Sequence, residues 1–201
     1  MGFTGRTWQN LPGFTPRLVS EYAVKVYGSG HVAAYNYVAN FHDGIDVATY
    51  GNPDGTPHPI RDRMPVSIDF YNNDITNVED NCIESDGGAL NIRVFRNRCF
   101  SHGHRALSVQ PVFGGPVYFL RNIVHHAPEG GAVKFTASSA GIVVYHNTLI
   151  APVKPMLLAA SNGHYRNNLI LGKSDTLETF AVETNRGLSP GDPPLQDVEG
   201  V

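Results

Sequence analysis

The chain has 201 residues, of which 41% are hydrophobic, and a net charge of −3 from 15 basic and 18 acidic side chains. This length is enough for one domain with a sizeable core. No apolar run approaches the roughly 18 residues of a membrane span, and no basic stripe suggests nucleic-acid binding. The first twenty residues lack the pattern of a signal peptide. We therefore expect a protein without a membrane span and without a nucleic-acid partner.

Short strand candidates recur along the chain in groups of three. Enrichment in Val, Ile, Tyr and Phe, with alternating apolar positions, favours strands over helices. The first strand of each group is expected at 66–70, 91–95, 117–120 and 142–145, and a shorter second strand at 74–76, 98–100, 123–124 and 148–150. A turn then leads to a third strand, expected at 44–48, 82–86, 106–110 and 132–136, with vaguer candidates at 157–159 and 180–182.

An asparagine recurs between the first and second strand of each group, in nearly the same local sequence. These residues are Asn36, Asn73, Asn97, Asn122, Asn147 and Asn167. Most steps between them are about two dozen residues, which is typical of a solenoid. Asparagine at one fixed point of each coil predicts a ladder of side-chain amides that hydrogen-bond from coil to coil. The predicted fold is an all-β, single-stranded parallel β-helix, a solenoid of about six coils with three short strands each.

We expect one domain over residues 1–201, with a repeat core at 22–184. Residues 49–64 include the run Gly-Asn-Pro-Asp-Gly-Thr-Pro-His-Pro, which is typical of a loop inserted between two coils. Residues 187–201 form an irregular tail. Neither end shows an amphipathic capping helix, and terminal coils usually need covering, so the chain is compatible with a segment of a longer protein.

The two cysteines, Cys82 and Cys99, are too few for a disulfide framework. Cys99 occupies the slot in the second strand that is apolar in the other groups. We therefore expect it to be a small buried thiol.

The asparagine ladder, the three strands per coil and the turn glycines (Gly87-Gly88 and Gly114-Gly115) resemble the pectate-lyase superfamily of right-handed parallel β-helix proteins. More narrowly, the chain is similar to its bacterial carbohydrate-binding and sugar-hydrolysing β-helix repeat proteins. The resemblance covers residues 22–184. It implies right-handed winding, a polysaccharide partner, and an extracellular or periplasmic location in a bacterium.

Many members of this superfamily are polysaccharide lyases or glycoside hydrolases that work in a groove along one outer sheet, and others are tailspikes, epimerases or adhesins. Polygalacturonase-type hydrolases carry a Gly-His-Gly signature. This chain has Ser101-His102-Gly103-His104 instead. No catalytic residue is therefore carried over from the family by name.

Ionisable residues gather around the third strand of successive coils. Because strand side chains alternate, the residues after the inward aliphatic ones face outward. Aligned on Ile45, Ile83, Leu107 and Val133, the outward column contains Asp46, Glu84, Ser108 and Lys134, with Asp86 and Gln110 beside it. Two further columns precede the aliphatic residues and contain His42, Asp80 and His104, and Asp43, Asn81 and Arg105.

This concentration predicts a site for an elongated, acidic sugar chain. We expect acid and base catalysis by Asp80, Glu84, Asp86 and His104, and substrate binding by Arg105, Lys134, Gln110 and His42. Two carboxyl groups at a set separation would permit glycoside hydrolysis. A lyase instead needs a neutralised uronate carboxylate and a base. Asp46, Glu84 and Asp86 could supply oxygen ligands to Ca²⁺, the one cofactor that we expect.

Other interpretations stay open. The charged residues could pair across coils on a solvated face, and the chain could be a non-catalytic solenoid such as an adhesin, a spike segment or a carbohydrate-binding module. His42 and Asp43 could form a catalytic dyad, although Asp-Gly is also an ordinary turn. The sequence predicts neither the substrate nor the oligomeric state.

Overall fold

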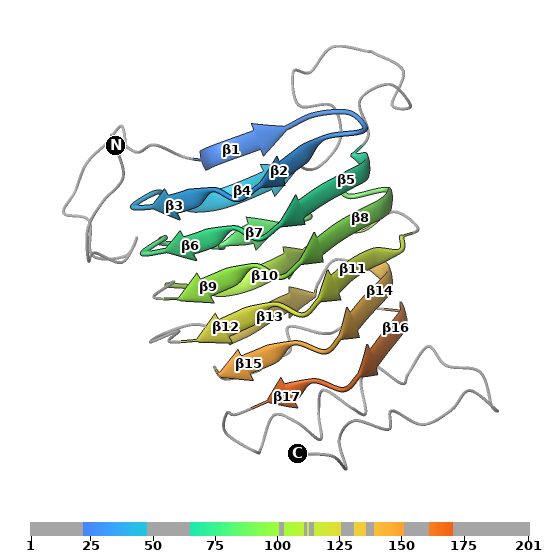
Figure 1. Ribbon diagram of the computed structural model, residues 1–201. Coiled ribbons are helices and arrows are strands. Elements are labelled where there is room, and N and C mark those ends of the chain that lie inside the picture. The colour runs from blue at the N-terminus through green and yellow to red at the C-terminus, as the bar shows by residue number, and fades with distance from the viewer. Residues whose placement is uncertain are drawn as a thin grey trace.

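The computed structural model describes residues 22–47, 65–100, 103–110, 112, 115–125, 131–135, 139–150 and 161–170. In these residues the coils stack along one axis, and each strand pairs in parallel with its equivalents in the neighbouring coils. The strands thereby form three parallel sheets that run along this axis (Figure 1). The expected loop at 49–64, the vaguer strands at 157–159 and 180–182, and the tail at 187–201 lie outside the described residues.

The strands follow one another along the chain in the order sheet A, sheet B, sheet C, up to β15. Sheet A contains β1 (Tyr22–Val26), β4 (Asp43–Val47), β7 (Ile83–Glu84), β10 (Arg105–Val109) and β13 (Gly131–Phe135). Sheet B contains β2 (Val32–Ala34), β5 (Val66–Tyr71), β8 (Leu90–Phe95), β11 (Val117–Leu120), β14 (Ala140–Tyr145) and β16 (Ser161–Arg166). Sheet C contains β3 (Tyr37–Ala39), β6 (Asp74–Thr76), β9 (Arg98–Phe100), β12 (Ile123–His125), β15 (Thr148–Ile150) and β17 (Leu169–Ile170).

The predicted all-β parallel solenoid is confirmed, but the expected number of coils was too high. From β1 to β13 the chain makes about four complete turns rather than six. In the described residues, sheet A has five strands, which are four steps along the axis. The right-handed winding stays a prediction.

The asparagine ladder runs along the corner between sheets B and C. From Asn73 onward, each ladder residue accepts hydrogen bonds at Oδ1 from the backbone N–H and the Nδ2 group of the asparagine one coil earlier. The Nδ2···Oδ1 distances are 2.9 Å for Asn36–Asn73 and Asn73–Asn97, 3.1 Å for Asn97–Asn122 and 3.0 Å for Asn122–Asn147. From Asn73 to Asn147 these side chains are almost fully buried, so the ladder satisfies polar groups that water does not reach.

In the described residues the last rung of the ladder is Asn168, so the prediction of Asn167 was wrong. Asn147 Nδ2 donates to Asn168 Oδ1 at 3.0 Å. Asn167 is exposed and has a positive φ of 54°. The residue before every ladder asparagine has this left-handed conformation, with φ between 53° and 60°. It turns the chain from sheet B into sheet C, and asparagine tolerates that conformation better than most residues.

The interior is filled by aliphatic and aromatic side chains from all three sheets. In sheet A, the predicted inward residues Ile45, Ile83, Leu107 and Val133 are all buried. They lie in register across β4, β7, β10 and β13. The alternation of the sequence therefore places the next residue of each strand on the outer face, as expected.

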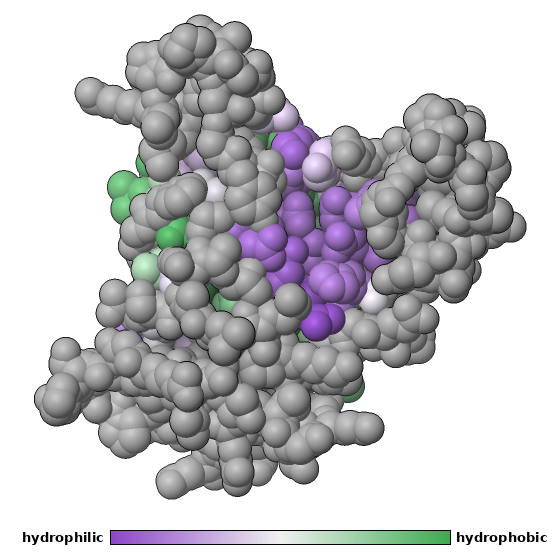
Figure 2. Space-filling view, turned by 180° about the vertical axis from the view of Figure 1, so that it is seen from behind, coloured by the Kyte–Doolittle hydropathy of each residue, from purple (hydrophilic) through white to green (hydrophobic). Residues whose placement is uncertain are grey.

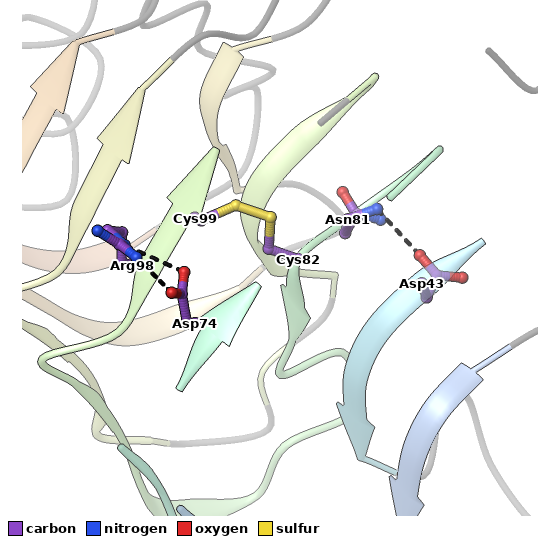
Figure 3. Close-up of a disulfide and its surroundings, with 6 residues drawn as sticks. All are labelled: Asp43, Asp74, Asn81, Cys82, Arg98 and Cys99. Atoms are coloured by element: carbon purple, nitrogen blue, oxygen red, sulfur yellow. Dashed lines mark hydrogen bonds and ion pairs between the residues drawn. A yellow bond between two sulfur atoms is a disulfide. The ribbon is translucent and has the colours of Figure 1, made fainter. Parts of the chain in front are cut away.

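Cys82 and Cys99 form a disulfide, so the expectation of a buried thiol was wrong. Cys99 does occupy the predicted slot, in register with Ile75 and Val124 of the neighbouring coils. Figure 3 shows its bond to Cys82, the residue immediately before β7. The Cα atoms are 6.2 Å apart and both residues are buried. The bond links sheets C and A through the interior of the solenoid.

Candidate functional site

A column of polar side chains crosses the outer side of sheet A. Register pairs Lys25 with Asp46, Asp46 with Glu84, Glu84 with Ser108, and Ser108 with Lys134. This arrangement confirms the predicted alignment of the last four residues. The view from behind shows hydrophilic residues gathered in one patch (Figure 2). Asp46, Glu84, Ser108 and Lys134 are nevertheless buried, which the sequence did not indicate.

Glu84 is the central carboxyl group of this column. Its Oε1 atom accepts a hydrogen bond from Asn81 Nδ2 at 2.5 Å and lies 3.9 Å from Lys134 Nζ. Burial, followed by the charges of nearby aspartates with Asp86 the strongest, raises the pKa of Glu84. The protonated acid is therefore favoured over the carboxylate.

Asp86 shares the lysine with Glu84. Its Oδ2 atom lies 3.8 Å from Lys134 Nζ, and its Oδ1 atom accepts a hydrogen bond from Ser108 Oγ at 2.6 Å. Burial raises the pKa of Asp86, although the charge of Lys134 opposes the shift. The structure thus places both carboxyl groups of the predicted pair, Glu84 and Asp86, within 4 Å of the ammonium group of the buried Lys134.

Asp80 and His104 form the most accessible ion pair of the site. His104 Nδ1 lies 2.9 Å from Asp80 Oδ1, and the side chains are 42% and 34% exposed. Burial alone would raise the pKa of Asp80, but the hydrogen bond and charge of His104 lower it. Asp80 therefore keeps its negative charge under conditions in which Glu84 is protonated.

Arg105 lies beside this pair at the start of β10. Its Nη1 atom donates a hydrogen bond to the carbonyl oxygen of His104 at 3.1 Å. The side chain is buried, and burial lowers the pKa of the guanidinium, with the charge of Asp80 acting in the opposite direction. Gln110, the other predicted binding residue of this coil, is partly buried immediately after β10.

His42 and Asp43 lie at the beginning of β4. His42 Nδ1 is 3.1 Å from Asp43 Oδ2, and Asp43 Oδ1 accepts a hydrogen bond from the backbone N–H of Asn81 at 3.0 Å (Figure 3). Burial alone would lower the pKa of His42, but the hydrogen bond and charge of Asp43 raise it. One ligand atom each of His42, Asp43 and Asp80 can be chosen within 4.8 Å of one another.

Asp46 is paired with a residue that the sequence analysis missed. Lys25 Nζ lies 2.8 Å from Asp46 Oδ2 and 3.8 Å from the centre of the Tyr22 ring. Burial raises the pKa of Asp46 to about 7, although Lys25 lowers it. The alternation of apolar residues around Lys25 in β1 was the signal that could have placed it in this column.

The arrangement combines a protonated acid, a charged carboxylate and several cations over neighbouring coils. Glu84 could donate a proton and Asp80 could accept one, because their environments shift their pKa values in opposite directions. Lys134 and Arg105 could attract an anionic ligand.

The part of the chain that the structure describes includes no helix long and apolar enough to cross a membrane.

No family model matches the chain, and comparisons with curated proteins and with solved structures find no match either.

Proposed function

We propose that the protein cleaves an acidic polysaccharide at the outer face of sheet A, and that hydrolysis of a glycosidic bond is the reaction this face supports best. The observation that carries the proposal is the opposite shift of two carboxyl groups on adjacent segments. Burial keeps Glu84 protonated, whereas the ion pair with His104 keeps Asp80 charged. Glycoside hydrolysis requires one carboxyl group in each state.

In this reaction Glu84 donates its proton to the glycosidic oxygen as the bond from that oxygen to the anomeric carbon breaks. Asp80 removes a proton from a water molecule, whose oxygen forms the new bond to the anomeric carbon. Asn81 fixes the Glu84 carboxyl group through its hydrogen bond of 2.5 Å. Lys134 and Arg105 attract the carboxylate groups of the substrate.

The parallel solenoid suits a long ligand. Equivalent positions of successive coils lie about 4.8 Å apart, so successive sugar units could follow the axis of the helix across β4, β7, β10 and β13. An extracellular or periplasmic location belongs to the same proposal. It is supported by the disulfide, since such bonds persist mainly in oxidising compartments.

The test is turnover of a panel of acidic and neutral polysaccharides, with products assayed for new reducing ends and for unsaturated sugars. We expect Glu84→Gln to lower kcat by about 10²–10⁴-fold, which is the usual contribution of a general acid, without lowering the melting temperature. Asp74→Asn is a matched control, because Asp74 is 32% exposed and lies on sheet C.

Three results would contradict the proposal in different ways. Unsaturated products would indicate elimination, for which His104 is the available base, and would replace hydrolysis by a lyase reaction. Undiminished turnover in Glu84→Gln would remove this residue from the mechanism. Binding of a polysaccharide without any product would favour a carbohydrate-binding solenoid.

A further inference from the structure

A second set of side chains converges at the corner where sheet C leads into sheet A. His42 and Asp43 come from the start of β4, and Asp80 comes from the equivalent segment one coil later. Ligand atoms of the three residues lie within 4.8 Å of one another. His42 and Asp43 are buried, and Asp80 is partly exposed. Among these three residues, Asp80 is therefore the one most accessible to solvent.

The backbone holds this corner tightly. The N–H groups of Glu79 and Asp80 both donate to the carbonyl oxygen of His42, at 3.0 and 2.8 Å. Gly44 allows the two coils to approach, since a Cβ atom at this position would lie 2.3 Å from the carbonyl oxygen of Cys82. The disulfide of Cys82 anchors the same segment to sheet C. These contacts hold the backbone segments that carry the three side chains close together.

Neighbouring groups also orient both carboxylates. The backbone N–H of Asn81 donates a hydrogen bond to Asp43 Oδ1 at 3.0 Å, while Asp43 Oδ2 lies 3.1 Å from His42 Nδ1. His104 Nδ1 lies 2.9 Å from Asp80 Oδ1. In each aspartate one oxygen is thus held by a group outside the cluster, which is how metal-binding carboxylates are usually positioned.

We propose that His42, Asp43 and Asp80 bind a divalent transition-metal cation such as Zn²⁺ or Mn²⁺. One imidazole nitrogen with two carboxylate oxygens suits these ions, whereas Ca²⁺ and Mg²⁺ prefer oxygen ligands alone. Bonds of about 2.0–2.2 Å place neighbouring ligands roughly 3–4 Å apart, so small side-chain rotations close the remaining distance. Three protein ligands leave coordination positions for water or for an oxygen of a substrate.

Two features of the surroundings support a bound cation. The segment carries an accumulation of buried carboxyl groups, since Glu79 lies next to Asp80, and Glu84 and Asp86 follow in the same coil. Asn81 is completely buried, and its Oδ1 atom accepts no hydrogen bond from the described residues. An unsatisfied buried acceptor is commonly paired with a bound water or ion, and the backbone N–H of the same residue donates to Asp43 Oδ1.

The acids that the sequence analysis expected to bind Ca²⁺ are less available for a cation. Asp46 faces Lys25 Nζ at 2.8 Å, and both Glu84 and Asp86 face Lys134 Nζ. A metal ion there would have to displace or repel these ammonium groups. Asp43 and Asp80 instead face the imidazole rings of His42 and His104, and a neutral imidazole is itself a ligand.

The proposal is tested by calorimetric titration of chelator-treated protein with Zn²⁺, Mn²⁺ and Ca²⁺, with no polysaccharide present. We expect one Zn²⁺ or Mn²⁺ site per chain. Loss of an orienting group near a metal weakens binding about 10–100-fold, so Asp80→Asn and His42→Ala should each weaken it at least that much. Asp74→Asn and His164→Ala, at exposed or partly exposed positions of sheets C and B, should bind as the unaltered chain does.

Circular dichroism in the presence of chelator shows whether each variant folds. If His42→Ala does not fold, the test rests on Asp80→Asn. The proposal is overturned if the folded chain binds neither Zn²⁺ nor Mn²⁺, or if Asp80→Asn binds as tightly as Asp74→Asn. Tighter binding of Ca²⁺ than of both other ions would also overturn it. The titration does not depend on polysaccharide cleavage. A bound metal ion and His104 would together occupy both oxygens of Asp80, so the proposed cleavage is assayed in the chelator-treated chain, and the site and the proposed function can fail separately.

Discussion

Removal of one amide from the middle of the asparagine ladder should strongly destabilise the solenoid. The side chain of Asn122 takes part in hydrogen bonds with Val94 O at 2.9 Å, Asn147 Oδ1 at 3.0 Å, the Asn97 backbone N–H at 3.0 Å and Asn97 Nδ2 at 3.1 Å. The residue is 1% exposed, so water cannot replace these partners. Each hydrogen bond contributes about 1 kcal/mol, and its loss leaves a buried polar group without a partner, which adds a further penalty. Asn122→Ala should therefore lower the free energy of unfolding by about 3–5 kcal/mol.

The first rung provides the control for this experiment. Asn36 also donates to the next asparagine, at 2.9 Å, but it is exposed. Asn73 Oδ1 keeps the hydrogen bond that it accepts from the Asn36 backbone N–H at 3.1 Å, so Asn36→Ala should lower the free energy of unfolding by less than about 1 kcal/mol. Denaturant unfolding followed by circular dichroism measures both variants. Equal losses at the two positions would refute the conclusion that the buried amide ladder stabilises the fold.

Three further predictions follow from the disulfide, the buried acid and the last rung. Replacing Cys82 and Cys99 together by alanine should lower the free energy of unfolding by about 3 kcal/mol for a sequence separation of 17; unchanged denaturant midpoints would contradict this. The pKa of Glu84 is raised above its usual 4.5, so the folded state binds the extra proton and its stability falls as pH rises above that value. Between pH 4.5 and about 9, Glu84→Gln should therefore gain stability relative to the unaltered chain as the pH increases. If the free energies of unfolding of the two proteins changed in parallel with pH, the result would count against the buried acid. Asn168→Ala should destabilise the chain by about 2–3 kcal/mol, clearly more than Asn167→Ala, whose side chain is exposed; the reverse order would mean that the ladder ends at Asn167.

Much of the ladder could be predicted because it depends on a pattern repeated in sequence. Asn73, Asn97 and Asn147 each occupy the same place between two apolar strands, and hydrogen bonding between coils requires that place to recur. At Asn167-Asn168 both residues are asparagines. One suits the left-handed corner and the other suits the ladder, so the pattern alone does not separate them. The disulfide was missed for another reason. Cys99 lies in sheet C and Cys82 immediately before β7 of sheet A, and strand patterns do not indicate which side chains meet across the interior of the coil.

The candidate site was predictable where it follows strand alternation. Asp46, Glu84 and Lys134 lie in one column because parallel register repeats the outward position in every coil. The burial of this column is not expected from alternation, which places it on the outer face, and the approach of His42 to Asp80 arises at a corner, where the backbone leaves the strand geometry. Alternation carries no information about such corners. The proposed metal-binding cluster therefore depends on contacts of the folded chain that the sequence pattern does not predict.

The most direct measurement of the central claim is a crystal structure of Glu84→Gln with an acidic oligosaccharide. We predict that the sugar chain lies on sheet A across β7 and β10, with a glycosidic oxygen within hydrogen-bond distance of residue 84 and a substrate carboxylate near Lys134. An oligosaccharide bound to sheet B or sheet C, with sheet A left uncovered, would contradict the account.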